Sequence, residues 1–427
     1  MSARRVGYVV SRFPKTTETF ILREMQAVEQ LGWHVDLFAI KREHNEILQP
    51  GANVYVDRLT AISDVSLGRQ SADQLRLLQA NPRLWLRLWR RTLLGNWRSP
   101  ATLLRALVIA FGAPSIARRV SKQEIEHLHA HWGTHSALLA HLVALLTGAT
   151  YSVTLHAHDM HVQRAMLQQK LEASTAVVTI SEHNASLLRE LYPSIVDRLE
   201  IVHCGVDTST TTPRGASAPN NPLRLVCVAG LRPFKGHRFL IAAVAELGRR
   251  GRSVTCDLVG DGPIREDLEA STPTSVRFHG ALDVERAMTV VSGADVFVMP
   301  SIEMADGRRD GIPVALMEAM AIGVPVIASN VSGIPELVIH EVTGLLVPPG
   351  DADAIADAVE RIIDDDLLRR RVTIAARQLV EQQFDISASG VAMTELFESA
   401  LHHRPARDQY DNSTDRHQRT TASRSTP

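Results

Sequence analysis

The chain has 427 residues, of which 45% are hydrophobic and 22% are charged, and its net charge is −1. This balance indicates a globular protein of two or three domains, and the near-neutral charge argues against nucleic acid as a partner. The cysteines Cys204, Cys227 and Cys256 have no metal or redox spacing, and no apolar run approaches the roughly 20 residues needed to cross a bilayer. We therefore expect a cytoplasmic protein.

Strand-like apolar runs alternate with helical patterns along the chain, which predicts parallel α/β units. In the first half we expect strands at 6–10, 35–40, 127–129, 151–155, 176–180 and 199–202. In the second half we expect them at 225–229, 255–259, 276–278, 296–299, 326–328 and 345–347. The two sets predict two doubly wound, Rossmann-like domains that face a cleft, because ligands bind at the carboxyl ends of such strands.

The expected domain boundaries follow from breaks in this alternation. Residues 1–207 form the first domain and 223–385 the second, and the linker 208–222 is rich in Thr, Ser and Pro and has no period. A helix at 386–401 is expected to cross back to the first domain. The tail, 402–427, is polar and aperiodic, and we expect it to be disordered.

The most informative segment runs from 299 to 327 and contains Asp310 and Glu318. It predicts a strand end, a glycine-containing loop, a helix start and a Gly-x-Pro break into the next strand. A helix N-terminus suits a phosphate, whereas the two carboxylates suit the hydroxyl groups of a sugar and a ribose. The ligand indicated is a sugar nucleotide, although a plain strand–loop–helix with surface acids has the same pattern.

This segment resembles the Glu-x7-Glu signature of glycosyltransferase family 4, whose fold is GT-B. Asp310 stands in place of the first Glu and Ile312-Pro313 in place of Phe-Gly, a form similar to that of exopolysaccharide-type and colanic-acid-type group 1 members. The resemblance implies that Asp310 and the backbone of Gly311, Ile312 and Pro313 contact the donor sugar. It implies that Glu318 contacts the ribose.

Further segments of the second domain resemble the same family. Lys235 and Arg232 lie in Gly-Leu-Arg-Pro-Phe-Lys-Gly (230–236) and are implied to neutralise the departing diphosphate. Gly262 lies in a Val-Gly-Asp-Gly-Pro turn, and Gly280 ends the strand implied to lie beside the nucleotide base. The alternative interpretations are surface cations at a helix start and a tight turn. The resemblance implies a donor substrate and no cofactor.

A metal ion is not indicated by the sequence. Asp351-Ala352-Asp353 has the Asp-x-Asp spacing of metal-dependent transferases, but it follows Pro-Pro-Gly and precedes a helical run. We interpret Asp351 as a helix N-cap with Asp353 as a first-turn acid, and 364–366 in the same way.

The first domain carries two segments that resemble polysaccharide enzymes of the family. Thr17 and Glu18 lie in the loop 11–20, Ser-Arg-Phe-Pro-Lys-Thr-Thr-Glu-Thr-Phe, which can bind acceptor hydroxyls or cap the next helix. In Thr-Leu-His-Ala-His-Asp (154–159) the resemblance places His156 beside the donor sugar, with His158 and Asp159 lining the same cleft. The histidine pairs here and at 129–131 have metal-like spacing, but we expect no zinc site because companion carboxylates and cysteines are missing.

A basic stretch, 81–122, contains no acidic residue and carries Trp85, Trp89 and Trp97. Arginines alternate with leucines and tryptophans, which is typical of a helix on an anionic membrane surface. The same pattern fits an amphipathic helix packed on the sheet with its arginines outward, and both interpretations stay open. The arginines concerned are Arg83, Arg87, Arg90, Arg91, Arg98 and Arg105.

The resemblance implies a retaining, metal-independent glycosyltransferase that moves a hexosyl group from a nucleotide-diphosphate sugar to a glycan or lipid-linked acceptor in surface polysaccharide synthesis. The departing diphosphate is expected to help deprotonate the acceptor, while the protein supplies positioning and charge stabilisation. Two rivals remain, a GT-B-type sugar-nucleotide 2-epimerase and a catalytically degenerate, transferase-like assembly subunit. A Rossmann dehydrogenase is disfavoured because no Gly-x-Gly-x-x-Gly follows the first strand.

Overall fold

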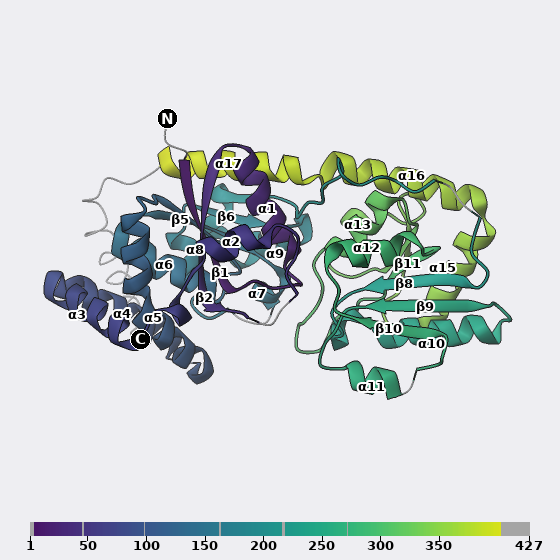
Figure 1. Ribbon diagram of the computed structural model, residues 1–427, viewed down its shortest axis with the longest axis horizontal. Helices are drawn as coiled ribbons and strands as arrows, with labels where there is room; N and C mark the ends of the chain where they lie inside the picture. The colour runs from purple at the N-terminus through teal and green to yellow at the C-terminus, as the bar shows by residue number, and fades with distance from the viewer. Residues whose placement is uncertain are drawn as a thin grey trace, which may run out of the picture.

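The computed structural model describes residues 4–44, 47–97, 99–161, 164–215, 218–270 and 272–402 (Figure 1). Arg98 and all but the first residue of the tail 402–427 lie outside these ranges, so the predictions made for them stay predictions. Within the described residues no helix is long and apolar enough to cross a membrane.

The first domain is built on a seven-stranded parallel sheet with strand order β3-β2-β1-β4-β5-β6-β7. The expected strands are present. The structure adds a two-residue edge strand, β3, which was not predicted because it is too short to leave a sequence pattern. The strands are β1 (Arg4–Phe13), β2 (Trp33–Arg42), β3 (Thr60–Ala61), β4 (His127–His131), β5 (Thr150–Leu155), β6 (Ala176–Thr179) and β7 (Leu199–Ile201).

Helices cover both faces of this sheet, which is why most of its strands are apolar on both sides. One core packs Leu128 of β4 against Leu88 and Ile109, and the other packs Tyr8 and Leu37 against Phe397. The helices are α1 (Thr19–Gln30), α2 (Ala52–Arg58), α3 (Leu67–Ala80), α4 (Pro82–Asn96), α5 (Pro100–Lys122), α6 (His135–Thr147), α7 (Ala157–His161), α8 (Leu167–Ala173) and α9 (Glu182–Leu191), with 3-10 turns η1 (Ile62–Asp64) and η2 (Pro193–Arg198).

The second domain has a six-stranded parallel sheet with order β10-β9-β8-β11-β12-β13. Its strands are β8 (Leu223–Val228), β9 (Val254–Val259), β10 (Val276–Gly280), β11 (Val296–Met299), β12 (Val326–Ser329) and β13 (Leu345–Val347). Its helices are η3 (Pro233–Lys235), α10 (His237–Arg249), α11 (Arg265–Ala270), α12 (Val284–Ser292), α13 (Val314–Ile322), α14 (Ile334–Leu337), α15 (Ala352–Asp364) and α16 (Asp366–Gln383).

Each sheet has a point where the direction of winding reverses, between β1 and β4 in the first and between β8 and β11 in the second. Ligands of doubly wound sheets bind at such points, beyond the carboxyl ends of the strands. The loops that follow β1, β4, β8 and β11 are therefore the places to look for a site.

The last helix, α17 (Ile386–His402), returns to the first domain and lies against α1 (Figure 1). Its Phe397 ring packs against Tyr8, Trp33 and His127, with ring centroids 5.3 to 6.1 Å apart. The chain thus crosses between the domains twice, once in the segment between β7 and β8 and once where α16 leads into α17.

Candidate active site

The loops after β8 and β11 bring Lys235 and Asp310 together. Lys235 Nζ lies 2.5 Å from Asp310 Oδ1, and the Ser301 hydroxyl donates to the other carboxylate oxygen. The approach depends on Gly236, whose φ is +70° and whose added β-carbon would lie 1.8 Å from the Pro300 carbonyl oxygen. A side chain at 236 would therefore force the two loops apart.

The other residues predicted for the diphosphate and the base have different surroundings. Arg232 is exposed and directly precedes η3 in the same loop as Lys235. Gly262 lies so close to the Leu231 backbone that an added β-carbon would be 2.3 Å from its carbonyl oxygen, and Gly280 ends β10 with a φ of +71°. These positions shape the turns at the strand ends, and their contacts with a donor stay predictions.

The segment after Asp310 faces the first domain. An added β-carbon on Gly311 would lie 3.2 Å from Ile180, which directly follows β6, while Ile312 and Pro313 are buried. Glu318 lies in α13, and its Oε1 accepts from Arg23 of α1 at 2.5 Å. Both predicted acidic residues therefore lie on the side of the second domain that meets the first.

The carboxyl ends of β4, β5 and β6 form the opposing edge. Leu155 of β5 is in register with Thr179 of β6, so His156 and Ile180 follow at neighbouring positions of that edge. Neighbouring strands lie about 4.8 Å apart. Since Ile180 faces Gly311, the sheet register places His156 on the edge of the first sheet that meets the loop carrying Asp310.

His156 is enclosed by aromatic rings and held by its own loop. Its ring centroid lies 4.3 Å from Trp132 and 5.0 Å from Phe20, and burial lowers its pKa well below the ordinary value. Its backbone N–H donates to Asp159 Oδ2 at 3.0 Å. The imidazole is therefore neutral and closely packed.

Asp159 is fully buried beneath this loop instead of facing the cleft. Desolvation raises its pKa to about 6, and its Oδ1 has no hydrogen-bond partner among the described residues. Its contact with the His156 backbone supports the loop. His158 lies in α7, and its side chain is outside the described part of the structure.

The predicted acceptor loop lies at the end of β1. Thr17 is exposed, and Glu18 caps α1 by position, although its side chain makes no cap hydrogen bond and instead pairs with Lys15 at 2.6 Å. A small pocket beside the loop is lined by Lys15, Glu18 and Gln49 among others. Most of its lining is apolar, and Lys15, Glu18 and Gln49 are polar residues there that could bind a hydroxyl group.

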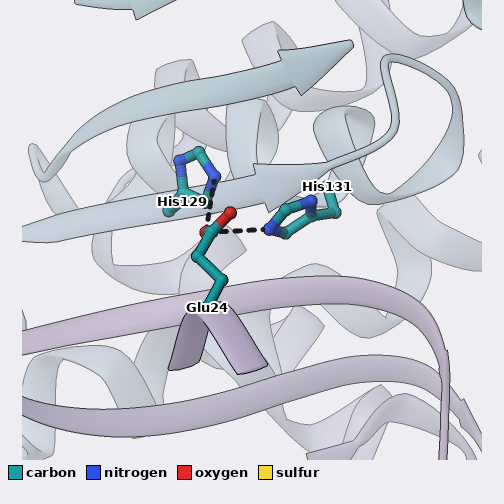
Figure 2. Close-up of side chains that lie close together, drawn as sticks. All are labelled: Glu24, His129 and His131. Atoms are coloured by element: carbon teal, nitrogen blue, oxygen red, sulfur yellow. Dashed lines mark hydrogen bonds and ion pairs between the residues drawn. The ribbon is translucent and has the colours of Figure 1, made fainter. Parts of the chain in front are cut away.

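One expectation about the histidines was wrong. A carboxylate does accompany the strand-end pair, because Glu24 of α1 reaches between His129 and His131 of β4 (Figure 2). The three candidate ligand atoms lie within 4.8 Å of one another. Each is also hydrogen-bonded within the protein: Glu24 accepts from the Tyr8 hydroxyl, and His129 Nε2 lies 3.0 Å from the Thr154 hydroxyl. The cluster is complete as a hydrogen-bond network and does not require an ion.

The acidic segments of the second domain behave as helix caps, as predicted. Asp351 Oδ1 accepts from the Ala354 N–H at 2.9 Å at the start of α15. Asp365 Oδ1 accepts from the Leu368 N–H at 2.9 Å at the start of α16. Metal independence itself stays a prediction.

Sequence reasoning assigned no role to Arg23 and Glu24, and it did not foresee the contact that Glu336 makes with the first domain. The Glu336 carboxylate caps α9 of the other domain, accepting from the Glu182 and His183 N–H groups at 2.9 and 2.8 Å. Arg23 and Glu24 are adjacent on α1, yet one meets the second domain and the other meets β4. The only available signal was their place in the helix that follows the predicted acceptor loop.

Comparison with known proteins agrees with this architecture. Residues 17–210 match Glycosyltransferase Family 4, and residues 222–365 match Glycosyl transferases group 1. The glycosyltransferase WcaL of Salmonella typhimurium, assigned to colanic acid biosynthesis, is 27% identical over 92% of this chain and 100% of its own length. The amylovoran biosynthesis glycosyltransferase AmsK of Erwinia amylovora is 27% identical over 92% of this chain and 99% of its own length.

Solved structures share the fold. The Anabaena protein Alr3699/HepE in complex with UDP and glucose has a TM-score of 0.67 at 15% identity, covering 93% of this chain and 100% of its own. A glycosyltransferase from Rickettsia africae has a TM-score of 0.66 at 17% identity, covering 94% and 100%. Two doubly wound sheets that face one another define the GT-B class of glycosyltransferase. The chain belongs to glycosyltransferase family 4, and it carries a family 4 domain followed by a group 1 domain.

Proposed function

We propose that this glycosyltransferase moves a hexosyl group from a nucleotide-diphosphate sugar to a glycan or lipid-linked acceptor in surface polysaccharide synthesis. Support for the pathway comes from WcaL and AmsK, whose names assign them to colanic acid and amylovoran biosynthesis. Support for the donor class comes from Alr3699/HepE, which was solved with UDP and with UDP-glucose.

The pairing of Lys235 with Asp310 carries this proposal. It sets a cation and a carboxylate side by side at the winding reversal of the second sheet, facing the edge that holds His156. An ammonium has three donors, so Lys235 can hold Asp310 and still contact a diphosphate. Asp310 and His156 offer acceptors for sugar hydroxyls, while Glu318 suits the ribose.

We propose a retaining reaction that uses no metal. The bond between the anomeric carbon and the diphosphate oxygen breaks, the acceptor oxygen bonds the same face of that carbon, and the acceptor proton passes to the departing diphosphate. Lys235 and Arg232 stabilise the charge that develops on the leaving group. The remaining side chains position the sugar and exclude water.

A lipid-linked acceptor implies a membrane surface, and we propose that α3, α4 and α5 bind one. Large apolar side chains are exposed on these helices and at the residue that follows α4: Leu67, Leu75, Leu78, Leu86, Leu93, Leu94, Trp97, Leu104 and Val108. Arg83, Arg90 and Arg105 are exposed on α4 and α5. Apolar side chains beside arginines match an anionic lipid interface.

The test is a thermal-shift panel of UDP-, GDP- and ADP-sugars, because a ligand that binds the folded chain raises its apparent stability. The stabilising sugar nucleotide is then incubated with and without a lipid-linked glycan acceptor, and the products are identified by mass spectrometry and the anomeric configuration by NMR. Sugar transfer with retention supports the proposal. Formation of an epimer without acceptor would establish the 2-epimerase instead, and no shift with any nucleotide sugar would favour an assembly subunit.

A further inference from the structure

A line of buried polar side chains leads from α1 to His156. His131 Nε2 lies 3.1 Å from Glu24 Oε1, and His131 Nδ1 lies 3.5 Å from His156 Nε2, a long hydrogen bond. His131 and His156 are 1% and 5% exposed. Figure 2 shows the first part of this line, with Glu24 extending from its helix toward His131 at the strand end.

The protons along this line can be assigned from its acidic end. The Tyr8 hydroxyl donates to Glu24 Oε1 at 2.8 Å, and burial together with Glu24 raises the pKa of Tyr8 well above its ordinary value. The phenol therefore keeps its proton and Glu24 acts as the acceptor. Because Glu24 accepts, the nearer nitrogen of His131, Nε2, must carry the hydrogen.

This assignment fixes the next ring. With hydrogen on Nε2 alone, the His131 ring has a lone pair on Nδ1, and in that form His131 Nδ1 accepts from His156 Nε2. His156 is itself neutral, because burial lowers its pKa. Its one hydrogen is then on Nε2, and its Nδ1 is left as an acceptor.

His129 lies beside this line but is not part of it. Its Nδ1 and Nε2 meet the Ser152 and Thr154 hydroxyls at 2.8 and 3.0 Å, while its distance of 3.7 Å from Glu24 exceeds a hydrogen bond. The rings of Trp132 and Phe20 close around His156 and keep water from competing with His131.

We propose that Glu24 and His131 are positioning residues that hold His156 as the neutral Nε2–H tautomer, so that its Nδ1 accepts a hydroxyl of the donor sugar. The role of the sugar rests on the proposed function, whereas the tautomer is a property of the protein alone. Helix α1 then serves two parts of the donor site, since Arg23, the residue before Glu24, meets Glu318, which we propose for the ribose.

The tautomer is measured by long-range ¹H–¹⁵N NMR on the full chain labelled with ¹⁵N-histidine, with His156 assigned by His156→Gln. We expect the Nε2–H form in the wild type. In His131→Phe, and in Glu24→Gln as a second variant, we expect a shift toward the Nδ1–H form or a mixture. The matched control is His127→Gln, a buried histidine of the same strand that bonds Thr150 and Ser152 and has no contact with the line.

Kinetics complete the experiment. In His131→Phe, kcat should fall by roughly 10- to 100-fold, the scale of a misplaced reacting group, while His127→Gln stays within about threefold of wild type.

An Nδ1–H tautomer in the wild type, or His156 signals unchanged in both Glu24→Gln and His131→Phe, would overturn the proposal. Stoichiometric zinc in the purified protein would also overturn it, by making Glu24 and His131 metal ligands. The NMR measurement needs no donor. A wild type without transferase activity would therefore refute the proposed function, whereas the tautomer of His156 would still be decided by NMR.

Discussion

Arg23 and Glu318, 295 positions apart, form an ion pair at 2.5 Å that joins α1 of the first domain to α13 of the second. Both side chains are largely buried, at 18% and 11% exposure, and Nη1 of Arg23 has no partner among the described residues. Two more polar contacts link the domains. Glu336 caps α9, and Gln49 accepts from the Val284 N–H at 2.9 Å. The residue predicted to hold the donor ribose is thus oriented by the opposite domain.

Arg23→Ala should raise the donor KM by about tenfold, equivalent to about 1.4 kcal/mol, because Glu318 loses the partner that orients it. Only Oε1 of Glu318 meets Arg23, so the second oxygen stays available to a hydroxyl. Steady-state kinetics with varied donor measure the effect. The control is Arg249→Ala, which removes an exposed arginine paired with Glu246. A lower donor KM in Arg23→Ala would show that the ion pair competes with the donor.

Lys235→Ala should lower kcat by about 100-fold or more, because a charge-assisted contact with the leaving group is lost in the transition state. Asp310→Asn removes the charge of its partner and should also impair turnover. The thermal melting temperature of each variant separates this loss from unfolding. The control is Lys41→Ala, which removes an exposed lysine beside Glu43. A folded Lys235→Ala enzyme within a few-fold of wild type would remove Lys235 from the site.

Activity should persist after treatment with EDTA, because Asp351 and Asp365 are occupied as helix caps and two cations are available for the diphosphate. The measurement is sugar transfer before and after chelation, with elemental analysis of the treated protein. Loss of activity that Mg²⁺ or Mn²⁺ restores would contradict the prediction. The candidate metal ligands would then be Glu24, His129 and His131.

The strands were predictable from sequence because parallel strands covered on both faces leave continuous apolar runs. The same reasoning placed the loops of Lys235 and Asp310 at strand ends, and the winding reversal between β8 and β11 explains why those two loops meet. The strand β3 was not predicted, because its two residues are too few to show a sequence pattern.

Contacts between the domains could not be predicted. The Arg23–Glu318 pair and the Glu336 cap depend on how two separately folded units dock, and no local periodicity encodes that arrangement. Glu24 was overlooked for a related reason, since a carboxylate on an amphipathic helix is ordinarily assigned to solvent. Here it turns toward β4, where its carboxylate accepts from the Tyr8 hydroxyl and from His131 Nε2.

Stability should fall as pH drops from about 6.5 toward 3. Burial lowers the pKa of His127 and of His141 to about 3, from an ordinary value of 6.5. Between these two pH values the unfolded state therefore binds protons that the folded state does not bind. At pH 5 each of these histidines should lower the free energy of unfolding by about 2 kcal/mol. Asp159, whose pKa is raised to about 6, should raise it by about 1 kcal/mol. Melting temperatures at pH 7.5 and 5.0 test this, and His127→Gln should show a smaller drop. A melting temperature that is constant or rises toward pH 5 would refute the assignment.

The membrane prediction depends on how the tryptophans of α4 are placed. Trp85 and Trp89 pack against each other, with centroids 6.1 Å apart, and Trp89 lies partly buried on the core, whereas Trp97 is 63% exposed. The packed-helix interpretation therefore fits Trp89, whereas the membrane interpretation stays a prediction for the exposed Trp97. Trp89→Ala should destabilise the fold by about 2–3 kcal/mol, and Trp97→Ala should not.

The wild type should sediment with anionic liposomes and be released as salt rises, since exposed charges are screened within about 10 Å at 0.1 M. Changing Arg83, Arg90 and Arg105 together to Gln should abolish sedimentation without lowering the melting temperature, because exposed arginines contribute little to stability. The matched control changes Arg249, Arg286 and Arg370, which are exposed arginines of the second domain, to Gln. Trp97→Ala should weaken binding at every salt concentration, since it removes apolar contact and no charge. Wild-type protein that stays in the supernatant at low salt, or equal loss of binding in both arginine triples, would show that α3, α4 and α5 are not a membrane surface.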